Sequence, residues 1–463
     1  MKKAGKNMKK KKDWQTKAMK RKHKEQDKGI LGIMFIVKHF FKHLTEWIEE
    51  MEDPRNISYI TYRQSDYVYM GILKNLCGVK TMHSMEEQFN ASACIRTLGL
   101  LSENSDLAEI PHSDSLNNYL KKLSPLCLAE LRRKMIKSLL RMKSFYGNRL
   151  LGKYWRIILD GTGLYCFKEK HCDNCLVTRR TMKDGKSVKV YYHKVLEAKL
   201  LLSENIVLSI DTEFIENEEE NTGKQDCEIN AAKRLLSRLK ENYPRLPICI
   251  QADNLYETQS IMELCGKNGF RYILTHKGSR QRNLHESYRL FIESGCAESL
   301  EGIGKERGKA IYVNHVEETV EKENTANIFE YSYSESKENG EIKNIKYQWI
   351  TDIDLTDKNV EEMIKAARGR WKIENEGFNN QKTGIYEIEH LNSRDRNAMK
   401  NHYLLTQIAD IIMQLYLAWN PMRKAIKLSI KNTSSMLLES FCRLKVTDED
   451  VSQSSRYTTV YLE

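Results

Sequence analysis

Hydrophobic and polar positions follow two different periods along the chain, and the change between them divides the sequence. Residues 30–52 and 64–145 repeat apolar positions every three to four residues, which predicts amphipathic helices. Pro125 stands where one of these helices begins, a position that proline favours. We therefore predict a helical N-terminal domain over residues 30–150.

Near residue 153 the helical period gives way to short apolar runs that are typical of strands. Three such runs precede a crossover helix, and this order predicts a mixed sheet with flanking helices, which makes the chain an α/β protein of several domains. The expected strands cover residues 154–159, 188–202, 206–215, 247–252 and 271–275, and the helix covers residues 226–242.

Residues 298–355 interrupt this order with β-rich segments separated by very polar stretches, and we expect them to form an all-β insertion. The first part of the α/β core then covers residues 151–297. Helical patterns return afterwards, so residues 356–420 are expected to complete the core. Residues 421–463 are predicted to form a C-terminal helical tail.

The charge of the chain is concentrated at its start. The 463 residues include 75 Lys and Arg against 63 Asp and Glu, a net charge of +12. Residues 1–28 hold 13 of the basic and 3 of the acidic residues, so this segment carries +10 and the rest only +2. We expect residues 1–29 to be a disordered basic tail, and a polycation of this kind attracts nucleic acid without sequence preference.

The eleven cysteines are scattered along the chain, which argues against a secreted disulfide scaffold and for a reducing compartment. The apolar run from Ile30 to Val37 is too short to span a membrane and is followed at once by Lys38. We therefore expect a cytoplasmic protein.

Two aspartates follow apolar strands directly. Asp160 ends the run from Tyr154 to Leu159, and Asp253 ends the run from Pro247 to Ala252. A charge at such a position is costly unless it is paired, solvated or bound to metal. Carboxylates are ligands for Mg²⁺ or Mn²⁺, and two such ions can drive an in-line phosphoryl displacement. We expect the two aspartates to share a metal site, although each alone is also typical of a strand cap.

A third acid is expected on a later helix, in the segment Arg370-Trp371-Lys372-Ile373-Glu374-Asn375-Glu376. Arg370 and Glu374 are four residues apart and share a helix face, and Lys382 follows two turns later. Both basic residues suit phosphate contacts beside a metal site. An ordinary surface ion pair explains the same spacing, and Glu376 is a rival for the third acid.

Five segments, in this order, resemble those of bacterial insertion-sequence transposases of the DDE class, from about residue 56 to 420. They are Leu159-Asp160-Gly161-Thr162-Gly163, Lys224-Gln225-Asp226-Cys227-Glu228, Ile250-Gln251-Ala252-Asp253-Asn254-Leu255-Tyr256, the segment Arg370 to Asn379, and Asn397-Ala398-Met399-Lys400-Asn401-His402-Tyr403-Leu404-Leu405.

The resemblance implies a ribonuclease-H-like core that cuts transposon ends and joins them to target DNA. It implies two Mg²⁺ or Mn²⁺ ions at Asp160, Asp253 and Glu374, double-stranded DNA as the partner, and a homodimer when two ends are synapsed. The sequence departs from the family twice: Ala367 stands where the family has Tyr, and Lys382 follows Glu374 by eight residues instead of seven. The Lys position fits only if the helix ends or bulges near Gly377.

The resemblance raises two further roles. Trp349, in Gln348-Trp349-Ile350-Thr351, corresponds to a Trp that stacks on a flipped base in members that form a DNA hairpin, and packing inside the β insertion is the alternative. Glu228 corresponds to a fourth carboxylate of ribonucleases H, and a salt-bridged helix end is the alternative.

A possible zinc site stands apart from these acids. His171-Cys172-Asp173-Asn174-Cys175 contains a C-x-x-C pair, and His193 follows, so Cys172, Cys175 and His193 could bind zinc. A reduced hairpin with two inert cysteines explains the same pattern.

The function predicted from these observations is a DDE transposase. The alternatives are a DNA-binding protein that no longer cuts, and a structure-specific nuclease without strand transfer. DNA recognition is expected within residues 30–150. Exposed-looking basic residues there are candidates for phosphate contacts: Arg63, Lys122, Arg132, Arg133 and Lys137.

Overall fold

The computed structural model describes residues 29–181, 185–217, 225–319, 322–336, 341–419 and 429–454. The chain forms two compact units, and both ends of the sequence belong to the same one. The first unit combines the residues up to Met142 with those from Asn379 onward, and the second is Lys143–Phe378. Among the described residues, no helix is both long and apolar enough to cross a membrane.

The first unit is helical, and its centre comes from the C-terminal part of the chain. The long helix α13 (Arg396–Trp419) packs against four of the N-terminal helices and is buried on nearly all sides. Asn401 donates hydrogen bonds of 2.8 Å to the carbonyls of both Leu120 and Leu123. The other helices of this unit are α2 (Ile30–Phe40), α3 (Leu44–Glu49), η1 (Ile57–Tyr59), α4 (Gln64–Leu76), α5 (Met82–Gln88), α6 (Ser92–Ser102), α7 (Ser113–Lys122), α8 (Pro125–Leu140), α15 (Ile430–Arg443) and α16 (Asp448–Ser454).

One of the proposed phosphate contacts in this unit is wrong. Arg132 is only 1% exposed in α8, so it is a core residue and not part of a DNA-facing surface. The helical period alone placed it on the solvent side, and the packing of α8 against several helices overrides that period.

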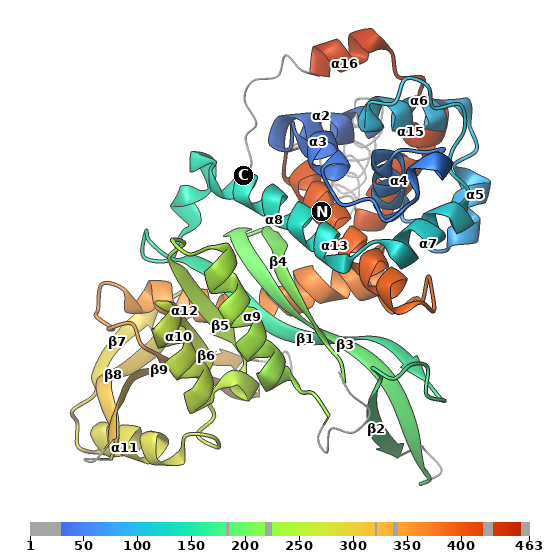
Figure 1. Ribbon diagram of the computed structural model, residues 1–463. Helices are drawn as coiled ribbons and strands as arrows, with labels where there is room; N and C mark the ends of the chain where they lie inside the picture. The colour runs from blue at the N-terminus through green and yellow to red at the C-terminus, as the bar shows by residue number, and fades with distance from the viewer. Residues whose placement is uncertain are drawn as a thin grey trace, which may run out of the picture. The chain divides into compact units, whose positions relative to one another are not determined.

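The second unit is built on one mixed sheet (Figure 1). Its central strands follow the order β4-β3-β1-β5-β6, with β3 and β4 antiparallel to their neighbours and β5 and β6 parallel to β1. This order and these directions are those of a ribonuclease-H-like fold, as expected. The elements, after the short η2 (Lys143–Asn148), are β1 (Trp155–Phe167), β2 (Leu176–Thr181), β3 (Ser187–Ser203), β4 (Ile206–Ile215), α9 (Glu228–Asn242), β5 (Ile248–Ala252), η3 (Asn254–Tyr256), α10 (Gln259–Asn268) and β6 (Arg271–Thr275).

The β insertion continues the same sheet. After α11 (Arg282–Glu293), the strands β7 (Glu298–Ile303), β8 (Gly308–Thr319), β9 (Lys322–Ser336) and β10 (Ile342–Thr351) form an antiparallel meander. β10 pairs with β6, so the insertion extends the core sheet at this edge.

The chain leaves the insertion through three consecutive helical segments. These are α12 (Val360–Arg368), η4 (Gly369–Trp371) and the π-helix η5 (Ile373–Gly384). Gln251 of β5 donates a 2.9 Å hydrogen bond to the carbonyl of Ala366, and Lys365 pairs with Glu204 of the β3–β4 turn at 2.9 Å. These contacts hold the end of α12 on the core sheet.

Candidate active site

Asp160 and Asp253 occupy equivalent positions on the two parallel strands at the centre of the sheet. The pairing of β1 with β5 ends at Ile158 opposite Gln251, and each aspartate comes two residues later. Equivalent positions on parallel neighbours project to the same face of a sheet. The structure therefore brings together the two acids that the sequence singled out.

Asp160 differs from the prediction in one respect: it does not end its strand. β1 continues to Phe167 because it stays paired with β3, whose Glu197 lies opposite Asp160. Asp160 instead marks the point where the parallel neighbour β5 ends. The opening required for a site is made by the end of β5, not by a turn in β1.

Burial, with a smaller contribution from the carboxylates of Asp253 and Glu228, raises the pKa of Asp160 to about 6. Arg370 and the backbone N–H of Gly161, which donates a 2.9 Å hydrogen bond to Asp160 Oδ1, act in the opposite direction. Asp253 in turn accepts a 2.8 Å hydrogen bond from the backbone N–H of Leu255. Three acids and one guanidinium therefore meet at this face of the sheet.

Glu228 is held in place by two partners. Its Oε1 forms an ion pair with Lys194 of β3, and its Oε2 accepts a 2.8 Å hydrogen bond from the hydroxyl of Tyr256. Glu228 also lies against Gly161 so closely that a Cβ atom there would overlap its carboxylate. Because both oxygens already have partners, this arrangement favours an electrostatic role for Glu228 over direct metal ligation.

Helix α9, which carries Glu228, is fixed to the neighbouring strand by charged pairs. Arg238 binds Asp211 at 2.9 Å and Glu213 at 2.6 Å, and Arg234 binds Glu213 at 2.5 Å. Asp211 and Glu213 are therefore structural acids.

The segment expected to supply the third acid lies over the same face of the sheet. Ile373 and Phe378 of η5 pack in a small core with Ile158, which shares its strand face with Asp160. The backbone of Glu374 belongs to this helix, while the side chains of Glu374 and its rival Glu376 lie outside the described part of the chain. Arg370, four residues earlier, lies within electrostatic reach of Asp160.

The one-residue shift of Lys382 relative to the family pattern coincides with a change in the helix backbone. The shifted spacing required a bulge near Gly377, and the helix there is a π-helix, which takes more residues per turn than an α-helix. Lys382 itself pairs with Glu389 at 3.2 Å. Ala367, at the position of the family's Tyr, is buried in the core of the second unit and only 4% exposed.

Trp349 lies inside that core. It is 4% exposed, and its ring packs against Phe329 at 5.2 Å and Tyr347 at 5.8 Å between ring centres. The packing described as the alternative is therefore what the structure shows for Trp349. Stacking on a base requires that it leave this core.

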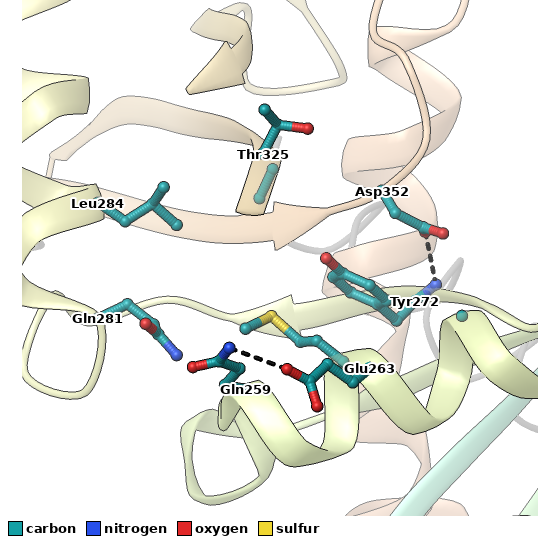
Figure 2. Close-up of a pocket in the computed structure, with 10 residues that line it drawn as sticks. Gln259, Glu263, Tyr272, Gln281, Leu284, Thr325 and Asp352 are labelled. Atoms are coloured by element: carbon teal, nitrogen blue, oxygen red, sulfur yellow. Dashed lines mark hydrogen bonds between the residues drawn. The ribbon is translucent and has the colours of Figure 1, made fainter. Parts of the chain in front are cut away.

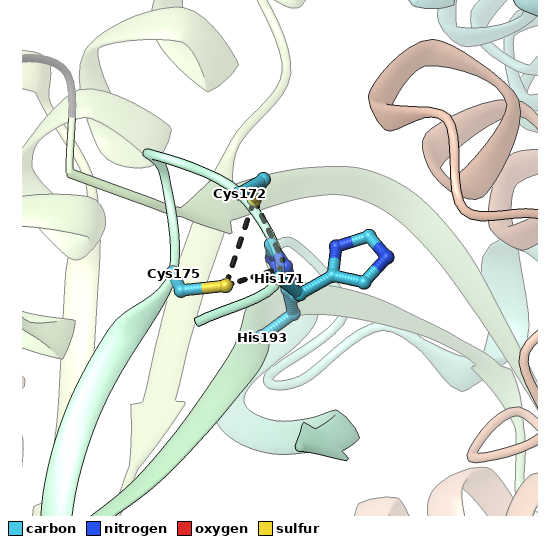
Figure 3. A group of neighbouring side chains, drawn as sticks. All are labelled: His171, Cys172, Cys175 and His193. Atoms are coloured by element: carbon cyan, nitrogen blue, oxygen red, sulfur yellow. Dashed lines mark hydrogen bonds between the residues drawn. The ribbon is translucent and has the colours of Figure 1, made fainter. Parts of the chain in front are cut away.

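A second cluster gathers the predicted zinc ligands and adds one more. Figure 3 shows Cys172, Cys175 and His193 in mutual contact with His171 beside them, and the ligand atoms of all four lie within 4.8 Å of one another. Burial, followed by the neighbouring Cys175 thiol, raises the pKa of Cys172. His171, the residue directly before the C-x-x-C pair, joins the predicted ligands Cys172, Cys175 and His193.

A pocket elsewhere in the second unit contains none of the predicted site residues. It lies between α10, β6 and α11, where Tyr272 donates its backbone N–H to Asp352 at 3.0 Å and Gln259 bonds Glu263 at 2.8 Å (Figure 2). Asp352 also pairs with Arg271 at 3.0 Å, so it is a structural acid.

Two residues of the site were missed by sequence reasoning. Lys194 lies in the middle of a long strand, and Tyr256 lies three residues after Asp253; both contact Glu228. Nothing in the periodicity distinguishes Lys194, whereas the position of Tyr256 just after a predicted catalytic acid was a usable signal.

No protein-family model and no curated protein matches this sequence. Among solved structures, the chain is similar to a piggyBac transposase in a synaptic complex with hairpin DNA, determined by cryo-EM. The TM-score is 0.39 and the identity 9%, over 92% of this chain and 84% of that chain. The order and directions of the strands, and not this similarity, establish the fold.

Proposed function

We propose that the protein is a DDE transposase that cleaves transposon-end DNA and transfers the ends to a target, with Asp160, Asp253 and Glu374 as its catalytic acids. The observation that carries the proposal is the register of Asp160 and Asp253 at the centre of the sheet, where β5 ends and the helix that carries Glu374 packs on the same face.

The donor set of this site fits hard divalent cations. The carboxylates of Asp253 and Glu228 repel that of Asp160, and the burial of Asp160 removes water that would screen this repulsion. A cation between them relieves that repulsion, and oxygen ligands favour Mg²⁺ or Mn²⁺. Asp160, Asp253 and Glu374 would hold the ions. When bound, two such ions activate water or a 3′-hydroxyl and stabilise the leaving oxygen.

The remaining residues prepare the site for a DNA phosphate. Arg370 offsets part of the negative charge around Asp160, and its guanidinium is suited to a phosphate oxygen when DNA is bound. Lys194 and Tyr256 hold the carboxylate of Glu228 in a fixed position. We assign Lys382 and Trp349 no direct step, because one is ion-paired and the other is buried.

Exposed basic residues on the ribbon formed by β2 and the first half of β3 support DNA as the partner. Arg179, Arg180, Lys186 and Lys189 are all exposed there. Such side chains bind the phosphate backbone without sequence preference and give affinity that falls with salt. We further propose a cytoplasmic protein that forms a homodimer when it joins two DNA ends.

The test uses the purified full chain and labelled DNA taken from both flanks of its own reading frame. We expect cleavage near the flank ends that requires Mg²⁺ or Mn²⁺, and insertion of the freed 3′-ends into a supercoiled target plasmid. Products are resolved on denaturing and native gels. Asp160→Asn, Asp253→Asn and Glu374→Gln should each lower cleavage by at least about a hundredfold and keep DNA binding.

Asp352→Asn is the matched control, because Asp352 is another partly buried carboxylate at a strand end but pairs with Arg271. It should retain cleavage. Cleavage without insertion would make the protein a nuclease, and binding without cleavage under either metal would make it a silent DNA-binding protein. Full activity of any one of the three acid variants would remove that residue from the mechanism.

A further inference from the structure

We propose that His171, Cys172, Cys175 and His193 bind one zinc ion in a tetrahedral site, separate from the catalytic acids, that braces the base of the β2–β3 ribbon.

The distances among three of the ligand atoms, Cys172 Sγ, Cys175 Sγ and His193 Nε2, are those of a tetrahedron around zinc, and all four ligand atoms lie within 4.8 Å of one another. Zn–S bonds of about 2.3 Å and Zn–N bonds of about 2.0–2.1 Å give edges of about 3.8 Å between two sulfurs and about 3.6 Å between sulfur and nitrogen. Cys172 Sγ and Cys175 Sγ are 3.6 Å apart, and each lies 3.5 Å from His193 Nε2. A disulfide is excluded, because its sulfurs lie about 2.05 Å apart.

The knuckle that carries three of the ligands is held from outside the cluster. Asn217, just past β4, donates its side-chain N–H to the carbonyl of Cys175 at 3.0 Å, and Asn174 donates to the carbonyl of Asn217 at 2.7 Å. The ring of Phe167 stacks on that of His171 at 4.4 Å between centres. These contacts orient the knuckle toward His193 of β3, as the outer contacts of metal ligands commonly do.

The Cys/His cluster lies where the β2–β3 ribbon joins the core sheet, so a metal ion bound there would stabilise this junction. The second half of β3 is buried between β1 and β4, whereas its first half pairs mainly with β2, is exposed from Ser187 to Lys189 and is only partly buried from Val190 to Tyr192. A two-stranded ribbon has too little core to be stable alone. His193 lies at the junction of the two halves, so a bond from His193 to the knuckle ties the ribbon to the sheet.

The two metal sites would select different ions. Two sulfurs and two imidazoles in a tetrahedron favour zinc, while a set of carboxylates favours Mg²⁺ or Mn²⁺. Zinc at the Cys/His cluster is therefore a structural ion with four protein ligands, and no open position is left for a reaction.

The test replaces zinc by Co²⁺ in the full chain and records the visible and near-ultraviolet spectrum. We expect about one zinc per chain as purified, intense visible bands of tetrahedral Co²⁺ after exchange, and a thiolate-to-cobalt absorption in the near ultraviolet. Carboxylates give no thiolate band, so this readout is independent of the catalytic site and of DNA cleavage. Wild-type protein without zinc and without a thiolate band after cobalt addition would overturn the proposal.

Variants locate the ion. Cys172→Ser with Cys175→Ser should remove the zinc and the thiolate band, and His171→Gln should weaken zinc retention in a competition with a chelating dye. Cys296→Ser is the matched control, because Cys296 is an exposed free cysteine away from the cluster, and it should keep both signals. A double-cysteine variant that folds, by circular dichroism, and still holds zinc would place the ion elsewhere and contradict the proposal.

Discussion

When no catalytic metal ion is bound, the charge of Asp160 destabilises the folded protein. Burial and two nearby carboxylates raise its pKa from 3.8 to about 6, so the folded state at neutral pH carries a charge that the unfolded chain holds more easily. We predict that Asp160→Asn raises the free energy of unfolding at pH 7 by about 1–3 kcal/mol in buffer without Mg²⁺ or Mn²⁺. Urea unfolding followed by circular dichroism measures it.

The sign of the pH dependence provides an internal control. Because the folded-state pKa of Asp160 lies above the unfolded value, wild-type stability should fall as pH rises from about 4 to about 6. The advantage of Asp160→Asn should therefore shrink as pH falls towards 4 and vanish well below the unfolded-state pKa of 3.8, where wild-type Asp160 is protonated in both states. A gain that is equal at pH 4 and pH 7 would mean that charge is not its cause.

Two glycines in β1, Gly161 and Gly163, differ in whether a site residue lies against them. A Cβ at Gly161 would overlap the carboxylate of Glu228, whereas nothing lies within 4 Å of one at Gly163. We predict that Gly161→Ala displaces Glu228 and lowers metal-dependent cleavage at least about tenfold, with a melting temperature close to wild type. Gly163→Ala is the control, and equal activity of the two variants would show that the position of Glu228 is unimportant.

For single residues, the sequence indicated the acidic residues of the site but not the residues that hold them in position. Asp160 and Asp253 were predictable because an acid directly after an apolar strand is rare and costly. Lys194 was not predictable, since its role depends on α9 returning across the sheet to bring Glu228 beside it. Trp349 showed the limit of resemblance, because a motif does not reveal whether its ring is packed or exposed.

Among the secondary-structure elements, the β2–β3 ribbon is proposed to bind DNA, and removing its positive charges tests this role. Arg179 and Arg180 are exposed on β2, and phosphate contacts of this kind contribute to affinity in proportion to their charge. We predict that changing both to Ala weakens DNA binding about tenfold at low salt and makes the salt dependence of the affinity less steep. Fluorescence anisotropy over a salt series measures both.

The matched control keeps the charge and changes the side chain. Arg179→Lys with Arg180→Lys should stay within about threefold of wild type, since phosphate attraction without sequence readout depends mainly on charge. Unchanged affinity of the double Ala variant would exclude the ribbon from the DNA-binding surface.

Local pattern predicted some elements to the residue and others poorly. Strands β4 (Ile206–Ile215) and β6 (Arg271–Thr275) match the predicted ranges, because β4 lies between the polar residues Asn205 and Glu216 and β6 is an apolar run with polar ends. β1 is longer than predicted, since its second half owes its form to pairing with β3 across a Gly-Thr-Gly stretch. The π-helical form of η5 has no periodic signature, and only the shifted position of Lys382 pointed to it.

For the whole molecule, the division into units predicts how fragments behave. The second unit is one continuous stretch, Lys143–Phe378, whereas the first needs both ends of the chain. We predict that a 143–378 fragment folds alone with a cooperative thermal transition. A 1–142 fragment should lack one, because α13, which lies at the centre of the first unit, is missing.

Co-expression of residues 379–463 with the 1–142 fragment should restore a helical, cooperatively melting complex, as judged by circular dichroism and gel filtration. A cooperative transition of the 1–142 fragment by itself would show that its helices form a core without α13.

The sequence predicted the mixed sheet, the β insertion and the helical N-terminal block, but it did not predict that the end of the chain joins that block. Residues 356–420 were expected to complete the core as one piece, whereas the structure groups the residues from Asn379 onward with the N-terminal helices. Such long-range packing leaves little local trace. The many apolar residues of α13 were the one available sign in the sequence, because a helix that is apolar on most sides must be enclosed.

Because α13 lies late in the sequence, the two units cannot fold in the order in which their first residues are synthesised. The N-terminal helices leave the ribosome first, but roughly 250 residues separate them from α13, a delay of about 13–50 s at about 5–20 residues per second. The sheet with Asp160 and Asp253 is therefore complete before the helices made first can bury their apolar faces. Until α13 arrives, those faces are surfaces for chaperones, and any truncation before Arg396 leaves them exposed for the lifetime of the chain.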